Sequence, residues 1–245
     1  MDRAILTQSE AKRAFVRKMF DGIAGTYDLL NHVLSLGVDI IWRRWTVDGL
    51  CPEPGWRILD LATGTGDLGF EAAGRSQEIE VIGADLSIQM LRRGVDKGRG
   101  RSDRMRFLCG DAETLPFPDQ LFDGITIGFG IRNVANLEAG LHEMFRVLKP
   151  GGRLAVLEFS RPRAVVFRGL YDFYFRHILP LVGRVVSRDP DAYRYLYESV
   201  MLFPEGEAFC RCLQTAGFTE TKVNRFSFGI ATLYLASKSS VEVVC

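Results

Sequence analysis

From about residue 57 onward, hydrophobic and polar positions alternate between two patterns along the chain. Short apolar runs bounded by turn residues predict buried strands, and longer stretches with apolar positions three or four residues apart predict helices. Strands that alternate with helices are typical of an α/β doubly wound fold, in which helices cover both faces of a mostly parallel sheet. The predicted strands are Arg57–Leu61, Glu80–Ala84, Met105–Leu108, Phe122–Gly128, Arg153–Glu158, Thr221–Arg225 and Thr232–Ser237.

The helical stretches fit between these strands. The turn at Leu148–Gly152 ends one of them, because proline cannot continue a helix and glycine supplies its left-handed exit. A short connection, Asn224 to Gly229, joins the last two strands as a hairpin and predicts an antiparallel edge on the otherwise parallel sheet. The predicted helices are Gly66–Ala73, Ser87–Lys97, Asn136–Val147 and Glu205–Ala216.

Two segments lie outside this alternation. Residues 1–50 carry apolar and aromatic positions at helical spacing, and residues 161–204 form a long insertion rich in aromatic side chains. A connection of that length is more often functional than accidental. The 245 residues suffice for one substantial core, so we expect a single domain. Its parts are a helical N-terminal cap (1–50), a core (51–160), the insertion (161–204) and a C-terminal helix with a hairpin (205–245).

The segment Arg57–Asp67 carries the strongest chemical signal in the chain. It predicts a buried strand with Asp60 near its end, then a turn of small residues, then the start of a helix. Gly64 and Gly66 permit the positive φ and the close ligand approach that such turns need. The next predicted strand leads to Asp85, whose carboxylate can accept hydrogen bonds from a ribose. Together these features predict a site for a nucleoside-type cofactor.

Two cofactors compete for this site. Gly64–Gly69 matches the G-x-G-x-x-G dinucleotide fingerprint, which favours NAD. Asp60 argues against NAD, because a carboxylate beside a pyrophosphate is repelled. S-adenosylmethionine has no phosphate, and its ammonium and sulfonium would be attracted by Asp60 and Asp67. In the simplest alternative the glycines only form a tight strand–helix turn. We favour S-adenosylmethionine.

A third acid, Asp111, follows the predicted strand Met105–Leu108. Its carboxylate can accept the amino hydrogens of adenine, and the backbone N–H of Ala112 can donate to the ring. An isolated acid there could instead form an Asx-turn. Ligands of open α/β sheets bind outside the carboxyl ends of the strands. The recurrence of acids at successive strand ends (Asp60, Asp85, Asp111) therefore supports the cofactor site.

Composition narrows the function classes. The formal net charge of +1 gives no support for nucleic-acid binding, and no spacing of cysteines or histidines predicts a metal site. The five scattered cysteines suit reduced thiols in a cytoplasm. No signal peptide is recognisable, and no apolar run reaches the roughly 18 residues that cross a bilayer.

Two longer motifs connect the chain to a known family. Arg146–Ser160 reads RVLKPGGRLAVLEFS, and Tyr27–Trp42 reads YDLLNHVLSLGVDIIW. With the cofactor turn, these make the chain resemble the class I S-adenosylmethionine-dependent methyltransferases, and within them the ubiquinone/menaquinone biosynthesis C-methyltransferases. The resemblance covers nearly the whole chain. Leu30 stands where the family usually has methionine and Asp39 where it usually has histidine, which puts any role of that histidine in doubt.

The resemblance implies a Rossmann-like fold that moves a methyl group from S-adenosylmethionine to a ring carbon of a polyprenylated quinol. Demethylmenaquinol is the favoured acceptor over a benzoquinol. Another small aromatic acceptor and a noncatalytic cofactor-binding partner remain alternatives. Gly128 stands where the family has a serine that contacts the cofactor. The expected cofactor-binding residues are Asp60, Thr63, Gly64, Thr65, Gly66, Asp85, Leu86, Asp111, Ala112 and Gly128.

The family resemblance also places Arg132 and Asn133 near the acceptor. We expect Arg132 to stabilise a developing phenolate as a cation, with Asn133 orienting it; a surface salt bridge is the plainer alternative for Arg132. The proton could leave through water to Asp111 or to His32, although a structural role for His32 is the stronger alternative. Tyr27 either closes over the cofactor or lines the channel for the acceptor. The expected acceptor-binding residues are Tyr27, Arg132, Tyr171 and Phe175.

In the insertion, Tyr171–Val186 interleaves apolar residues with Arg176 and Arg184. Because quinone precursors of this pathway carry polyprenyl tails, the segment suits a lid that accepts the tail and touches a membrane surface. Packing on the core and a homodimer interface are equally open. We therefore expect a cytoplasmic protein that meets the inner face of the membrane peripherally.

Overall fold

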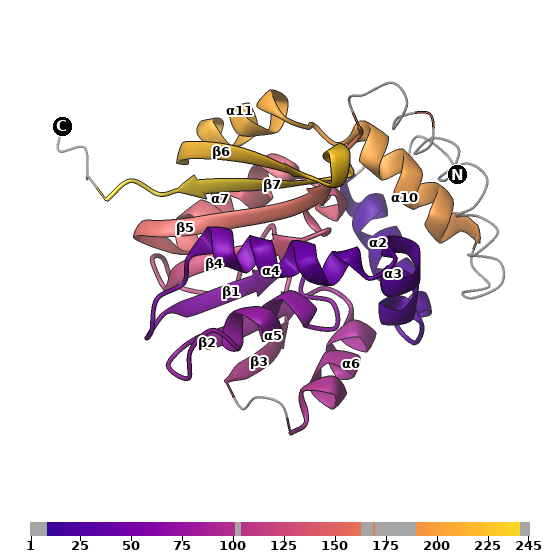
Figure 1. The fold of residues 1–245 in the computed structure, drawn as a ribbon, viewed down its shortest axis with the longest axis horizontal. Helices are drawn as coiled ribbons and strands as arrows, with labels where there is room; N and C mark the ends of the chain where they lie inside the picture. Colours follow the sequence, from indigo (N-terminus) through magenta and orange to yellow (C-terminus); the bar gives the residue numbers. More distant parts are fainter. Residues whose placement is uncertain (1–8, 101–103, 163–168, 170–189, 241–245) are drawn as a thin grey trace.

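The computed structural model describes residues 9–100, 104–162, 169 and 190–240. Within these residues the strands form one seven-stranded sheet of order β3-β2-β1-β4-β5-β7-β6 (Figure 1). Strands β1 to β5 are mutually parallel, as the alternation of strands and helices predicts. The strands are β1 (Arg57–Leu61), β2 (Glu80–Asp85), β3 (Met105–Cys109), β4 (Phe122–Gly128), β5 (Leu148–Phe159), β6 (Thr219–Phe226) and β7 (Ala231–Ser237).

The predicted hairpin of the last two strands is confirmed. Strands β6 and β7 pair antiparallel across the short 3-10 turn η3 (Ser227–Gly229). Strand β7 also pairs antiparallel with β5, so the strand that runs against the others lies one place inside the sheet. Strand β5 begins five residues earlier than predicted, because Leu148 already pairs with Phe122 before an irregularity in the register.

The four predicted helices are present, with small shifts of their ends. The predicted first residues Ser87 and Asn136 are caps, whose side chains accept the N–H groups of Met90 (3.2 Å) and Ala139 (3.1 Å). A cap has an extended backbone and so lies outside the helix proper. The helices are α2 (Ser9–Ile23), α3 (Tyr27–Ser35), α4 (Val38–Leu50), α5 (Asp67–Ala73), α6 (Ile88–Gly98), α7 (Leu137–Val147), α10 (Pro190–Leu202) and α11 (Glu207–Thr215), with a 3-10 turn η1 (Ile131–Asn133).

The two faces of the sheet bury separate cores. Alternate residues of β1 face opposite sides: Leu59 and Leu61 pack with α7 and α11, whereas Ile58 packs with α4 and α5. Helix α4 of the cap therefore belongs to the core layer and crosses one face of the sheet (Figure 1). This three-layer arrangement fixes the carboxyl ends of β1, β2 and β4 relative to one another.

Helices from distant parts of the chain gather at that carboxyl edge. Helix α2 contacts α6 and η1, and α10 also contacts η1. In Figure 1 α2, α3 and α10 lie together at the end of the sheet toward which the β1, β4 and β5 arrows point. Tyr171, Phe175, Arg176 and Arg184 lie outside the described residues. Among the described helices, none has the length and apolarity needed to cross a bilayer.

Candidate active site

The turn between β1 and α5 is compact and glycine-dependent. Gly64 and Gly66 have φ values of 57° and 89°, in the region that disfavours side chains. A Cβ on Gly66 would also lie 3.0 Å from ring atoms of Phe70 and Phe107. The Gly66 N–H donates to the Thr63 carbonyl (2.9 Å), which closes the turn. The backbone thus passes close to the carboxyl ends of β1 and β2.

Asp60 lies beneath this turn rather than in the cavity beside it. Its side chain is almost completely buried and accepts hydrogen bonds from the hydroxyls of Thr63 (2.5 Å) and Thr126 (2.7 Å). Burial raises the pKa of Asp60 to about 6, although these hydrogen bonds oppose the rise. Asp60 and Thr63 therefore brace the turn, and a direct contact with the cationic tail of a cofactor stays a prediction.

Asp85 lies in the cavity wall at the end of β2, where backbone N–H groups hold its carboxylate. Its carboxylate accepts the N–H groups of Gly64 (2.8 Å) and Ser87 (2.8 Å), which ties the glycine turn to the end of β2. Burial raises its pKa, while the backbone donors favour the ionised form. Asp85 and the adjacent Leu86 both line the cavity. The carboxylate can therefore meet a ligand while its orientation is fixed by the backbone.

Asp111 has partners that the sequence did not reveal. Its Oδ1 accepts the Glu113 N–H (3.0 Å), which is the Asx-turn alternative, and Asp111 also lines the cavity. Arg13 of α2 lies 2.8 Å from Asp111 Oδ2 and 2.7 Å from Glu113 Oε2. About 100 residues separate Arg13 from these acids, so no local sequence pattern could have paired them.

The glycine turn, these acids and η1 line a cavity that is open to solvent, and the empty space of about 680 Å³ within its walls includes part of that solvent. The residues fit a cationic nucleoside cofactor, because the part of the wall that the structure describes is largely apolar and carries three carboxylates, Asp85, Asp111 and Glu113, and only one cation, Arg13. Among the predicted site residues, those that line the cavity are Tyr27, Gly64, Asp85, Leu86, Asp111, Ala112, Gly128 and Asn133. Those that do not are His32, Asp60, Thr63, Thr65, Gly66 and Arg132.

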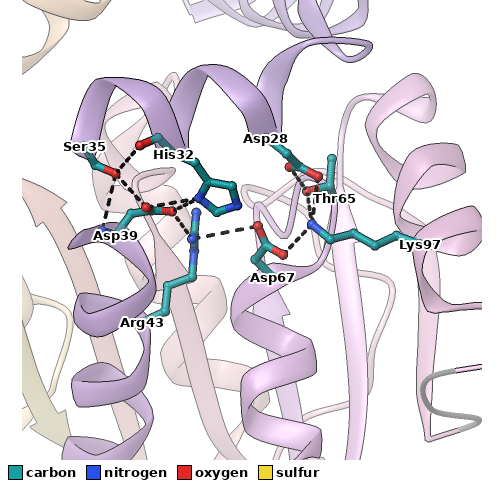
Figure 2. Close-up of polar contacts among 8 residues, drawn as sticks. All are labelled: Asp28, His32, Ser35, Asp39, Arg43, Thr65, Asp67 and Lys97. Atoms are coloured by element: carbon teal, nitrogen blue, oxygen red, sulfur yellow. Dashed lines mark hydrogen bonds and ion pairs between the residues drawn. The ribbon is translucent and has the colours of Figure 1, made fainter. Parts of the chain in front are cut away.

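Thr65 belongs to a polar network that joins the cap to the glycine turn. Its hydroxyl donates to Asp28 of α3 (2.5 Å). Lys97 of α6 bridges Asp28 (2.8 Å) and Asp67 of α5, so three helices meet around one ammonium (Figure 2). The charge of Asp67, expected to attract the cofactor, is thus already neutralised.

His32 lies in the second part of this network. Its Nδ1 is 2.9 Å from Asp39, which also pairs with Arg43 and accepts from the Ser35 hydroxyl (2.6 Å) (Figure 2). Burial opposes the ionised form of Asp39, but these partners outweigh it and lower its pKa. Arg43 Nη1 also lies 3.8 Å from Asp67 Oδ2, which connects the two parts of the network. His32 therefore sits in the packing of α3 on α4, and a role as base stays a prediction.

Arg132 forms a buried ion pair in place of the surface salt bridge considered as an alternative. Its side chain is 7% exposed, and Nη1 lies 2.6 Å from Glu158 Oε1, which is fully buried at the end of β5. Arg132 also donates to the Phe129 carbonyl (2.5 Å) and the Ser199 hydroxyl (3.3 Å). Burial raises the pKa of Glu158, and the Arg132 charge counteracts it. Glu158 lies within the RVLKPGGRLAVLEFS motif, but the sequence alone assigned it no role.

Known proteins resemble this chain closely. The model of the ubiE/COQ5 methyltransferase family matches residues 6–238. The chain is 45% identical over 226 residues to the ubiquinone/menaquinone biosynthesis C-methyltransferase UbiE of Geotalea daltonii, covering 91% of this chain and 96% of that protein. It is 43% identical over 237 residues to the demethylmenaquinone methyltransferase of Deinococcus radiodurans, covering 97% and 98%.

Solved structures share the fold at lower identity. An S-adenosylmethionine-dependent methyltransferase of Thermotoga maritima, described as a possible histamine N-methyltransferase, superposes with a TM-score of 0.65 and 21% identity, covering 91% of this chain and 99% of that one. The cyclase SpnF gives a TM-score of 0.67 at 19% identity, covering 92% and 96%. Because one fold hosts a methyltransferase and a cyclase, these two structures establish the architecture and not the reaction.

Proposed function

The chain belongs to the ubiE/COQ5 methyltransferase family, and from this premise we propose that it converts demethylmenaquinol to menaquinol. It is an S-adenosylmethionine-dependent C-methyltransferase of quinone biosynthesis. The naphthoquinol acceptor is the finer part of the proposal. Menaquinone occurs in the names of both relatives, whereas ubiquinone occurs in only one of them, and this supports the choice.

The observation that carries the proposal is the cavity at the carboxyl edge of β1, β2 and β4. S-adenosylmethionine, when bound there, would supply an electrophilic methyl group on a sulfonium; the sulfur would keep the electron pair of the broken bond, and the ring carbon that gains the methyl would lose its hydrogen as a proton to water. Asp85 would hold the ribose hydroxyls, and Asp111 the adenine amino group, with Ala112 donating its N–H to the ring. Gly128 lines the cavity where the family has a serine that contacts the cofactor, so only its backbone atoms would be available for that contact.

The other predicted cofactor residues support the cavity from outside it. Asp60 and Thr63 brace the glycine turn, and Thr65 fastens it to α3. Tyr27 of α3 lines the cavity, and one of its ring carbons would lie 3.7 Å from a Cβ on Gly64. Tyr27 thus closes the cavity above the glycine turn, where it can exclude water from the methyl group.

The protein must also align the ring and increase its nucleophilicity. Holding two reactants in line contributes about 7–11 kcal/mol. Ionising a phenol of pKa about 10 at pH 7 costs about 4 kcal/mol. Arg132 remains our candidate for offsetting part of that cost. Its guanidinium does not line the cavity, so it would act from behind the wall, with a charge that the paired Glu158 partly cancels. His32 is retained only as a distant proton acceptor.

We also propose that the protein meets a membrane surface peripherally, as a polyprenylated acceptor requires. Four exposed apolar side chains support this: Leu36, just before α4, and Ile40, Ile41 and Trp45 within α4; we refer to these four residues as the α4 surface. Leu36 is 90% exposed, and Arg44 is also exposed, four residues after Ile40 and so one helical turn along the same side of α4. Apolar side chains with an interleaved cation suit the interface of an anionic bilayer.

The purified protein tests the reaction directly. We expect it to transfer labelled methyl from S-adenosylmethionine to a short-tailed demethylmenaquinol, giving a product heavier by one methyl group. A demethylated benzoquinol in parallel reactions measures the preference. Tight binding of S-adenosylhomocysteine without methylation of either quinol would refute the proposed reaction, and a faster reaction with the benzoquinol would refute the choice of acceptor.

A further inference from the structure

One face of α2 forms part of the cavity wall. Arg13, Val16 and Phe20 all line the cavity, and their spacing of three and four residues places them on one side of the helix. Val16 is buried, and the ring of Phe20 meets the ring of Tyr27 edge-on, with 5.9 Å between centroids. A purine has apolar faces and a polar edge, so two apolar side chains beside one cation suit it.

Arg13 bridges two carboxylates that follow β3. Its Nη2 donates to Glu113 Oε2 (2.7 Å), and its Nε lies 2.8 Å from Asp111 Oδ2. Backbone groups hold the other oxygen of each carboxylate. Asp111 Oδ1 accepts the Glu113 N–H (3.0 Å), and Glu113 Oε1 accepts the N–H groups of Ala135 (3.0 Å) and Asn136 (2.9 Å). Among the described residues, Arg13 therefore holds the second oxygen of both side chains.

The contact between Arg13 and Asp111 is an ion pair without a hydrogen bond. Although Nε lies 2.8 Å from Oδ2, its N–H is not directed at that oxygen, and Nε has no hydrogen-bond partner among the described residues. No other residue in the described part of the chain donates to Oδ2. Asp111 lines the cavity, and its side chain is 17% exposed. Oδ2 thus keeps a position at which it can accept a hydrogen bond, while a cation sets where this oxygen lies.

Loss of the guanidinium would change the balance of charge around Asp111. Asp111 Oδ2 and Glu113 Oε2 each lie within 2.8 Å of a nitrogen of Arg13, so the two carboxylates are close neighbours. Like charges at such a separation repel, and a neutral side chain at position 13 would leave this repulsion unopposed. Because the backbone bonds hold only Oδ1 and Oε1, the second oxygens would turn away from each other. The direction in which Oδ2 accepts a hydrogen bond therefore depends on Arg13.

We infer that Arg13 sets the specificity of the cofactor site for adenine, as a positioning residue that holds Asp111 Oδ2 where it accepts the amino group of the base. This inference rests on the proposed function, which places adenine at Asp111 and Ala112. An ionised carboxylate can only accept, and the 6-amino group of adenine supplies the donor. Arg13 thus acts on the ligand through Asp111.

The test compares Arg13→Met with the parent protein on S-adenosylhomocysteine and on its analogue in which purine replaces adenine. The analogue lacks the 6-amino group but keeps the ring nitrogens, so the ratio of the two affinities reports the amino contact. Calorimetry measures both affinities without turnover. We expect the parent to bind S-adenosylhomocysteine about 10–100-fold more tightly than the analogue, because a hydrogen bond to a charged acceptor is lost with the amino group.

In Arg13→Met we expect this ratio to fall several-fold. The Arg13 side chain is 35% exposed, so its replacement should leave the fold intact, which thermal unfolding verifies. Arg13→Lys restores a cation without the planar fork and should recover part of the ratio. Arg17→Met is the matched control, because Arg17 is exposed on the same helix and does not line the cavity. It should keep the ratio of the parent.

The outcomes separate this inference from the proposed function. A parent-like ratio in Arg13→Met, even with both affinities lowered, overturns the inference and leaves Arg13 as a contact that only docks α2. A larger ratio also overturns it, because Arg13 would then compete with the amino group for Oδ2. Equal binding of both ligands by the parent would remove adenine from Asp111 and overturn the inference together with that placement. A ratio that falls as expected, in a protein that methylates neither quinol, overturns only the proposed reaction.

Discussion

Among the residues that the structure describes, Arg132 is the one cation paired with the buried carboxylate of Glu158. Glu158→Gln leaves that cation buried without a counter-charge, and we expect the free energy of unfolding to fall by about 3–5 kcal/mol. Thermal unfolding measures this, at about 2–4 °C per kcal/mol for a chain of this size. As a control, Glu53→Gln removes an exposed partner of Arg153 and should change stability by less than about 1 kcal/mol.

A second variant separates charge from shape in the same pair. Arg132→Met combined with Glu158→Leu removes both charges, and we expect stability to return to the parent level or above it. Methyl transfer should nevertheless remain low, because the contacts that orient the wall are lost with Arg132. Full activity of the double variant would rule out any part for the pair in the reaction.

Asp60 predicts a dependence of stability on pH. Its folded pKa is raised to about 6 from 3.8, so between these values the folded protein binds more protons than the unfolded chain. Stability is therefore fully present below pH about 4 and falls as pH rises toward 6, by up to about 3 kcal/mol. Asp60→Asn should lack this decline when denaturant unfolding is compared across that range. A parallel decline in both proteins would mean that Asp60 does not titrate there.

At the scale of single residues, the sequence predicted which acids line the cavity better than it predicted the side chains with which they pair. Asp85 and Asp111 line the cavity at strand ends because the parallel topology brings those ends together. The sequence could not reveal that Arg13 neutralises Asp111 or that Lys12 holds the backbone around Asn133. Such contacts depend on where α2 docks, and about 100 intervening residues carry no local pattern that encodes it.

At the scale of secondary-structure elements, the attachment of α3 to the glycine turn depends on the ion pairs that Lys97 makes with Asp28 and Asp67. Lys97→Met leaves Asp28 and Asp67 close together without their shared ammonium, so we expect α3 to loosen from the glycine turn. These groups are partly exposed, and the effect should stay near 0.5–2 kcal/mol and weaken at high salt. Hydrogen exchange in α3 should increase, with weaker S-adenosylhomocysteine binding.

Arg99→Ala is the matched control for that experiment. Arg99 follows α6 and makes only an exposed pair with Asp96 among the contacts described, at 3.3 Å. The Arg99→Ala substitution removes a cation from the same end of α6 as Lys97 but leaves the contacts of α3 unchanged. Unchanged exchange in Lys97→Met, or equal change in both variants, would contradict a specific hold on α3.

The boundaries of helices and strands were predicted correctly where the residues at each end decide them. Strands β1 and β4 match the prediction residue for residue, because buried apolar runs end at turn residues on both sides. Ser87 and Asn136 were counted into helices that they cap, since cap and first turn share composition. The early start of β5 at Leu148 depends on pairing with β4, a tertiary effect that outweighs the proline–glycine turn.

The molecule as a whole exposes the α4 surface. We expect Ile41→Ser with Trp45→Ser to reduce sedimentation with anionic vesicles several-fold, because apolar side chains that insert among lipids are lost. Ile88→Ser with Val95→Ser is the control, since these α6 side chains are similarly exposed. Equal vesicle binding by both double variants and the parent would exclude the α4 surface as the membrane contact.

The position of β7 also affects how the chain matures during synthesis. Every other described strand precedes β7, yet β7 pairs with β5 inside the sheet. Nascent chains emerge from their amino end, so β5 keeps an open hydrogen-bonding edge until residues 231–237 have left the ribosome. An open edge invites pairing with other chains. Stalled or prematurely terminated translation products that lack these residues would therefore aggregate, even though the cofactor turn and its acids are already complete.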